Sequence, residues 1–102
     1  MFIGFTSLEG TRTFFFQAVN GSGVPTAATG SPAYRVYEPG NETPLKTGTM
    51  SAFDSGNTTG FYSANFTADA SSGFEVGTDY VIRITATVSA AAKADVQEFT
   101  VI

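Results

Sequence analysis

GFEVGTDYVIRITATV, residues 73 to 88, is the stretch that decides the fold. A turn with two glycines leads into a long segment in which apolar and polar side chains alternate, which is the pattern of a β-strand with one buried face. One face carries Tyr80, Ile82, Ile84, Ala86 and Val88. The other face carries Val81, Arg83, Thr85 and Thr87. The alternation predicts a strand that packs one face on a core and turns the other to water.

Shorter alternating segments, separated by Gly, Pro, Asn and Ser, fill most of the remaining chain. We expect further strands over residues 2–7, 11–19, 33–38, 43–53, 60–68 and 95–102. The segment 43–53 is the weakest because Gly48 interrupts it. SAAAKA, residues 89–94, is too short to hold a helix in isolation, so we expect a turn or a single helical turn there. About seven short strands predict an all-β, immunoglobulin-like antiparallel β-sandwich.

The chain has 102 residues, which is the size of one domain. We expect residues 11–102 to form the sandwich and residues 1–10 to form a separate N-terminal segment. Phe2, Ile3 and Phe5 make that segment apolar, and a small core does not readily absorb it. Two alternatives follow, because unpaired strand edges invite addition. The segment is an edge strand of its own fold, or it is an anchor on a neighbouring subunit, with Phe2, Ile3 and Phe5 as partner-binding residues.

Composition excludes several classes of function. The chain contains no His, Cys or Trp, so neither a Ser/His/Asp triad nor a disulfide can form within it. The net charge is −4 and the five basic residues are scattered, which argues against nucleic acid as a partner. No apolar run approaches the roughly 18 residues of a membrane helix, and no signal segment is recognisable. We interpret the chain as a complete small protein that folds in a reducing cytoplasm.

Two segments contain several side-chain oxygens that could form a metal-binding or catalytic site. FDSGNTTG, residues 53–60, supplies Asp54 and Asn57 but lacks the second Asp and the closing Glu of a calcium loop, so we expect an Asx turn. The connection before the long strand gathers Asp69, Glu75 and Asp79. Paired carboxylates serve glycosidases, yet solvated loop acids are the simpler interpretation. We therefore predict no catalytic, cofactor-binding or metal-binding residues, and no enzymatic activity.

From residue 11 onward the chain contains, in order, a series of short motifs: the aromatic strand TFFFQ, the turn GVP, the GSP before a strand with VY, the FDS before a glycine turn, GFEVGTDY, and the final EFTV. In these motifs and their order, the chain resembles small immunoglobulin-like virion proteins of tailed bacteriophages. Two parts depart from the pattern. SAAAKADVQ, residues 89–97, is richer in Ala than the corresponding hairpin of the family, and residues 1–10 lie outside the resemblance.

The resemblance implies a non-enzymatic phage virion structural protein. Its most direct form is a capsid decoration or cement protein, made in the bacterial host cytoplasm and bound to the outer capsid surface. The implied partners are the major capsid protein, other virion proteins or further copies of the chain. The alternative is a carbohydrate-binding or adhesion module of a head fibre, neck or tail, holding host-surface glycan through Tyr34, Tyr37 or Tyr62. The absence of Trp counts against this alternative.

Overall fold

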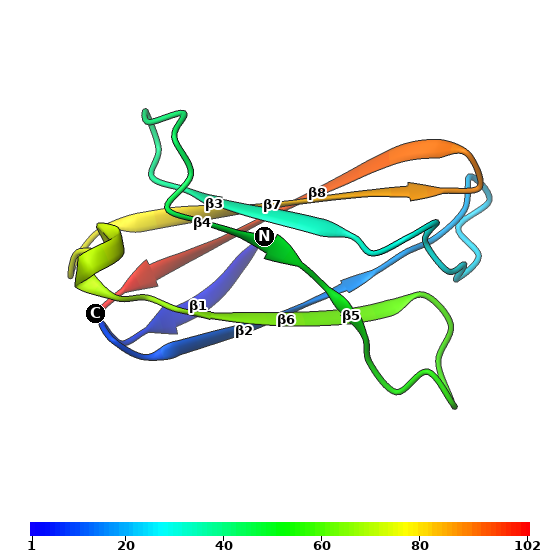
Figure 1. The fold of residues 1–102 in the computed structure, drawn as a ribbon, viewed down its shortest axis with the longest axis horizontal. Coiled ribbons are helices and arrows are strands. Elements are labelled where there is room, and N and C mark those ends of the chain that lie inside the picture. Colours follow the sequence, from blue (N-terminus) through cyan, green and yellow to red (C-terminus); the bar gives the residue numbers. More distant parts are fainter.

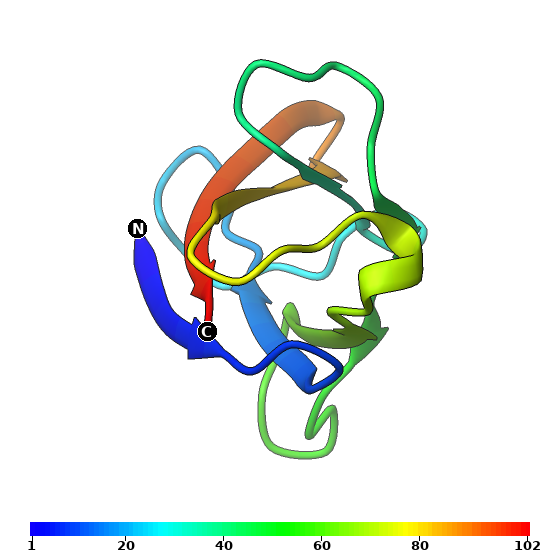
Figure 2. The same ribbon diagram turned by 90° about the vertical axis from the view of Figure 1, so that its left-hand side faces the viewer.

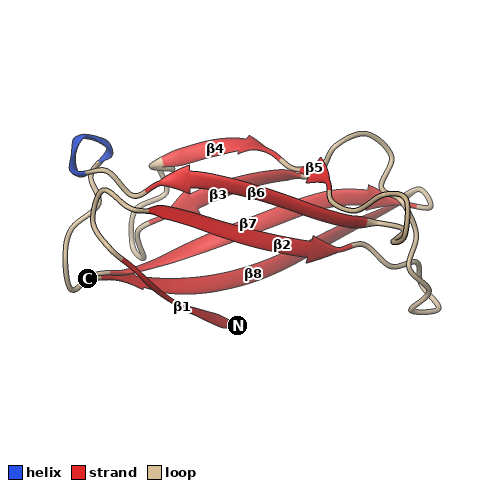
Figure 3. Cartoon of the chain, turned by 90° about the horizontal axis from the view of Figure 1, so that it is seen from below, coloured by secondary structure: helices blue, strands red, loops and turns tan.

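Two β-sheets packed face to face make up the computed structural model, which describes residues 1–102 (Figure 1). The strands are β1 (Phe2–Thr6), β2 (Thr11–Gln17), β3 (Ala33–Tyr37), β4 (Lys46–Thr49), β5 (Ser51–Ala52), β6 (Phe61–Thr67), β7 (Asp79–Val88) and β8 (Ala91–Val101). One sheet has the order β1-β8-β7-β3-β4 and the other the order β2-β6-β5. Figure 3 shows the strands of both layers running along the length of the molecule. The prediction of an all-β sandwich is confirmed.

The larger sheet is mixed, whereas the sequence predicted antiparallel pairing throughout. Strand β1 runs parallel to β8, with Phe2 opposite Glu98 and Thr6 opposite Val101. The reason is the path of the chain, which leaves β1 for β2 in the other sheet instead of turning back beside β1. Residues 1–10 are thus part of the sandwich, and Figure 2 shows the N-terminal strand lying against the C-terminal one.

Strand β7 has the clearest pattern because it is central to the larger sheet. It pairs with β3 on one side and with β8 along its whole length on the other. Tyr80, Ile82, Ile84 and Val88 are fully buried, and Ala86 packs against the core. The residues between them are exposed or partly exposed. The strand therefore has one buried face and one face turned to water, as the alternation predicted.

Aromatic rings fill the space between the sheets. The largest contributors are Phe14, Tyr34, Phe66, Phe74, Tyr80 and Phe99, all buried. Phe14 and Tyr34 meet edge to face with ring centroids 5.0 Å apart, and the centroids of Phe66 and Phe99 are 5.6 Å apart. Each such ring removes on the order of 150–250 Å² from water. The core therefore holds the sheets together without a disulfide.

Tyr80 anchors the connection between β6 and β7. Its hydroxyl accepts a hydrogen bond from the backbone N–H of Glu75 at 2.7 Å, and its ring lies 4.8 Å from that of Phe74. The connection contains the one helical element, the short 3₁₀ turn η1 (Ala70–Ser72). No helix of the structure has the length and apolar character needed to cross a membrane.

The segment 43–53 differs from the prediction of one strand broken at Gly48. It forms β4 and β5, which belong to different sheets, and the chain crosses between them at the buried Met50. Gly48 lies inside β4. A glycine is needed at this position because the Tyr34 ring packs over it. A Cβ added at Gly48 would come within 2.7 Å of the Tyr34 hydroxyl oxygen.

The last two strands are joined by a two-residue turn, so the alternative of a helical turn over residues 89–94 is wrong. Ser89 and Ala90 both have positive φ, 51° and 63°. This conformation matches the right-handed twist of the flanking strands, and it normally selects Asn and Gly. The Ala-rich residues that follow already belong to β8.

Replacing Tyr80 by Phe should lower the free energy of unfolding by about 1–3 kcal/mol, because the Glu75 N–H loses its acceptor. Urea denaturation measures the change. Tyr37→Phe removes the same atom from a hydroxyl with no partner in the protein and should be nearly neutral. Equal losses in the two variants would contradict the assigned role of Tyr80.

Replacing Ala90 by Gly should raise the free energy of unfolding by about 0.5–1 kcal/mol. The left-handed conformation costs an L-residue roughly 1–2 kcal/mol, and the greater freedom of Gly in the unfolded chain offsets part of the gain. Ala92→Gly, in regular β8, should destabilise instead. Thermal melting of both variants tests the turn geometry, and a loss of stability in Ala90→Gly would rule it out.

Candidate functional site

The edge strand β1 displays two phenylalanines side by side. Phe2 is 54% and Phe5 62% exposed, and their rings meet edge to face with centroids 5.4 Å apart. Side chains three positions apart point to opposite faces in a regular strand. Here the register of β1 against β8 shifts between Phe2 and Phe5, where Gly4 has a φ of 108°. The irregularity brings the two rings together on the surface, and we call Phe2 and Phe5 the N-terminal aromatic pair.

Ile3, the third predicted partner-binding residue, lies apart from this pair. It is half-buried and packs against the hydrophobic core. Its side chain therefore helps to hold β1 on the sandwich, while the N-terminal aromatic pair faces outward.

Backbone hydrogen bonds fix β1 to its own chain. The Glu98 N–H donates to the Met1 carbonyl at 2.8 Å, and the Ile102 N–H donates to the Thr6 carbonyl at 2.9 Å. The ammonium group of Met1 donates to the Val96 carbonyl at 3.1 Å. Of the two alternatives left by the sequence, the structure shows the edge strand. The other edge of β1 carries no strand.

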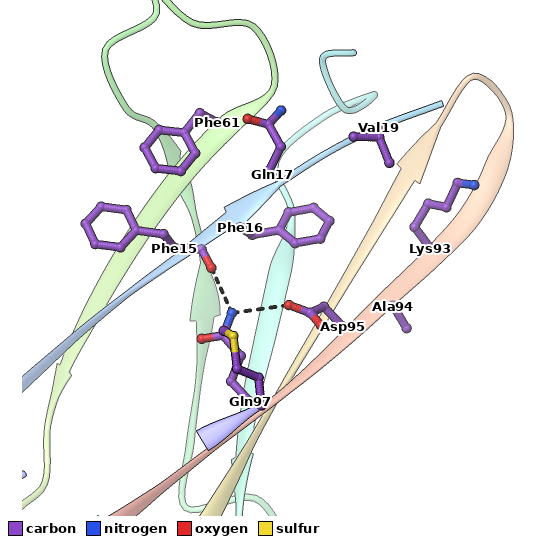
Figure 4. Close-up of a pocket in the computed structure, with 10 residues that line it drawn as sticks. Phe15, Phe16, Gln17, Val19, Phe61, Lys93, Ala94, Asp95 and Gln97 are labelled. Atoms are coloured by element: carbon purple, nitrogen blue, oxygen red, sulfur yellow. Dashed lines mark hydrogen bonds between the residues drawn. The ribbon is translucent and has the colours of Figure 1, made fainter. Parts of the chain in front are cut away.

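A groove opens on the flank of the sandwich beside the N-terminus, where β1 begins. It has a volume of about 450 Å³ and lies between β2 and β8 (Figure 4). Met1 contributes to its lining. Gln97, only 3% exposed, crosses it and donates to the Phe15 carbonyl at 2.8 Å and to Asp95 Oδ2 at 3.2 Å. This one side chain therefore links the two sheets at a flank that no strand covers.

A second aromatic cluster lies on the outer face of the three-stranded sheet. Phe15 stacks on Phe61 at 5.4 Å between centroids, and Phe53 meets both rings edge-on. Phe15 is 41% and Phe53 47% exposed, whereas Phe14 and Phe16 are buried. Alternation along β2 separates Phe15 from the buried Phe14 and Phe16, but it does not relate Phe15 to Phe53 or Phe61. Only the pairing of β2, β5 and β6 brings the three together.

The predicted candidate acids are held separately. Asp69 forms the one ion pair of the structure, with Lys46 Nζ at 3.3 Å. A hydrogen bond from Ser72, assisted by Lys46, lowers the pKa of Asp69. Asp79 accepts a hydrogen bond from the Thr100 hydroxyl. No group of three or more acidic side chains is placed to hold a metal ion.

Residues 53–60 form a turn closed by their own side chains. Asn57 Nδ2 donates to Asp54 Oδ1 at 2.9 Å, and the Thr58 hydroxyl donates to the Asp54 carbonyl at the same distance. The carboxylate and the amide that a calcium loop would direct to a cation are therefore bonded to each other.

Two of the three tyrosines predicted to contact glycan are in the core. Tyr34 and Tyr62 are 7% and 8% exposed, and the Tyr62 hydroxyl accepts a hydrogen bond from the Ala28 N–H. Burial raises the pKa of Tyr34. Their assignment as sugar contacts is wrong, because both lie on inward-facing strand positions that fill the space between the sheets. Tyr37 alone remains partly accessible.

No protein-family model matches the chain, and neither characterised proteins nor solved structures gave a match.

Replacing Gln97 by Met should lower the free energy of unfolding by about 1–3 kcal/mol, because Met keeps the length of the side chain but cannot donate to the Phe15 carbonyl. Gln17→Met, on an exposed position of β2, is the matched control and should cost less. Urea denaturation compares the two. If Gln97→Met is no more harmful than the control, Gln97 does not link the sheets.

Proposed function

We propose that the chain is an immunoglobulin-type sandwich that serves as a non-enzymatic structural protein of a phage virion, specifically as a decoration or cement protein on the outer capsid surface. The resemblance of residues 11–102 to virion proteins of this kind supports the proposal. The structure contributes two arguments, one on the type of sandwich and one on the surface that would meet the capsid.

The strand order favours the immunoglobulin type of sandwich. In that type, strands B, E and D share one sheet and strands C, F and G the other. By their positions along the chain, β2, β6 and β5 correspond to strands B, E and D, and β3, β7 and β8 correspond to strands C, F and G. A tyrosine near the start of strand F that bonds to backbone a few residues upstream is a hallmark of the type. Tyr80, bonded to the Glu75 N–H, has that position.

Exposure of the N-terminal aromatic pair is the main support for the proposed contact with the capsid. Phe2 and Phe5 expose more than half of their surface on a strand whose outer edge is unpaired. A partner strand or loop can add to such an edge through backbone hydrogen bonds while the rings bury apolar area. Each contact is small, but many copies on one lattice act together. The partner would be the major capsid protein or a sister subunit.

The test is occupancy of capsids that lack the protein, measured by co-sedimentation. Phe2→Ser combined with Phe5→Ser should lower occupancy at least about tenfold, a loss of roughly 1.4 kcal/mol per copy, and should leave the melting temperature nearly unchanged because both rings are exposed. Deleting Met1–Phe5 is a poorer test, because it strips β1 from β8 and uncovers core beneath Ile3.

Phe15→Ser combined with Phe53→Ser is the matched control, since it removes two partly exposed rings, 41% and 47% accessible, from another face. Full occupancy of the N-terminal variant would refute the proposed contact. Loss in the control variant alone would move the contact to the outer face of the three-stranded sheet.

Glycan binding is the second candidate, and the cluster of Phe15, Phe53 and Phe61 is the observation that favours it. The outward positions paired around it are uncharged and polar, including Gln17, Ser63 and Asn65. Aromatic rings beside amide and hydroxyl groups can hold a sugar. Binding on a glycan array that disappears in the Phe15→Ser, Phe53→Ser variant would support this candidate over the capsid contact.

A further inference from the structure

Two arginines stand directly opposite each other on the outer face of the five-stranded sheet. Arg35 on β3 pairs in register with Arg83 on β7, and both side chains are exposed. They are two of only three arginines in a chain with a net charge of −4. Like charges directly opposite on neighbouring strands destabilise a sheet. The like charges of this pair are therefore expected to cost stability.

Neither guanidinium has a partner within the protein. The one ion pair of the structure is Lys46 with Asp69, and no side-chain hydrogen bond involves Arg35 or Arg83. The neighbouring strands offer no counter-ion in register, because Thr47 lies opposite Arg35 on β4 and Val96 lies opposite Arg83 on β8.

The carboxylate nearest in register on this face is that of Glu98. It lies two positions from Val96 along β8, opposite Val81, and it forms no ion pair with Arg83. The two positive charges consequently remain available to a ligand.

The arginines line a hollow of about 210 Å³. Ala33, Tyr37 and Thr85 complete its lining. A second hollow of about 530 Å³ adjoins it, shares Arg83 and Thr85, and includes Lys93 in its lining. Lys93 pairs in register with the core-packed Ala86, so its side chain leaves the sheet on the face opposite to Arg83. We call the two hollows, joined at Arg83 and Thr85, the arginine track.

We propose that this track binds an acidic segment of a partner protein through its aspartate or glutamate carboxylates. A guanidinium offers paired N–H donors that match the two oxygens of a carboxylate, and such charge-assisted pairs are stronger than neutral hydrogen bonds. One carboxylate in the smaller hollow contacts Arg35 and Arg83 and relieves their repulsion. The adjoining hollow, which shares Arg83, leaves room for the same segment to continue across the sheet.

An acidic peptide fits this track better than an acidic sugar. No Asn or Gln lines the smaller hollow to bond sugar hydroxyls, and Tyr37 is its one aromatic residue. Charge complementarity is what the track offers. The inference does not depend on the virion role, since any protein partner with such a segment would satisfy it.

The experiment is a titration of the ¹⁵N-labelled protein with a hexaglutamate peptide at low ionic strength, followed by NMR. Amide shifts should concentrate on β3 and β7 around Arg35 and Arg83 and should weaken as salt screens the charges. Arg35→Gln combined with Arg83→Gln should weaken binding at least about tenfold. The matched control, Arg12→Gln combined with Lys46→Gln, removes the same charge elsewhere and should change affinity less than about threefold.

Stability supplies an independent readout. The Arg35→Gln, Arg83→Gln protein should melt at the same temperature as the parent or higher, because the like-charge pair is removed. A loss of binding then cannot be ascribed to unfolding. A lower melting temperature would show that the pair supports the fold, and it would overturn the argument from repulsion.

Two further outcomes would overturn the proposal. One is hexaglutamate binding that both double variants weaken equally. Binding would then depend on the net charge of the protein and not on the Arg35–Arg83 pair. The other is equally tight binding of inorganic phosphate or of an oligogalacturonate of the same charge. The first of these two ligands would indicate a general anion site and the second a site for acidic glycan.

Discussion

Burial of the apolar face of β7 is the constraint on which the other surfaces depend. Tyr80 begins this face, with its ring against Phe74 and Phe99, and its hydroxyl accepts the Glu75 N–H and so joins the connection after β6 to the start of β7. Because side chains alternate along a strand, Ile82 and Ile84 share the buried face with Tyr80. Arg83 is therefore directed outward.

The remaining surfaces follow from the neighbours of β7. Strand β8 pairs with it along its whole length and leaves its own far edge to β1, which covers only the second half. That geometry leaves the N-terminal aromatic pair on an open edge and a groove beside Met1. On the other side β3 brings Arg35 to Arg83. Each candidate surface lies on an edge or an outer face of a rigid sandwich, where a partner can bind without distorting the core.

Local pattern was enough to predict most strands and the core residues on them. Alternation has a period of two residues, so the sequence alone separates Phe14 and Phe16 from Phe15. It does not report pairings between distant segments. The placement of Arg35 opposite Arg83 and the cluster around Phe61 both come from register between strands far apart in the chain.

Local irregularities of the strands could not be predicted for a different reason, because they break the regular alternation. The Gly4 irregularity places Phe2 beside Phe5, although plain alternation would separate them. Gly48 suggested a break, yet it is required inside β4 by the Tyr34 ring, and the true crossing is at Met50.

The most direct measurement of the proposed role is a cryo-electron microscopy map of the phage particle that carries this protein. We expect the sandwich to repeat across the outer capsid shell with β1 turned toward it. Density confined to the tail, or no density for the sandwich, would contradict the account.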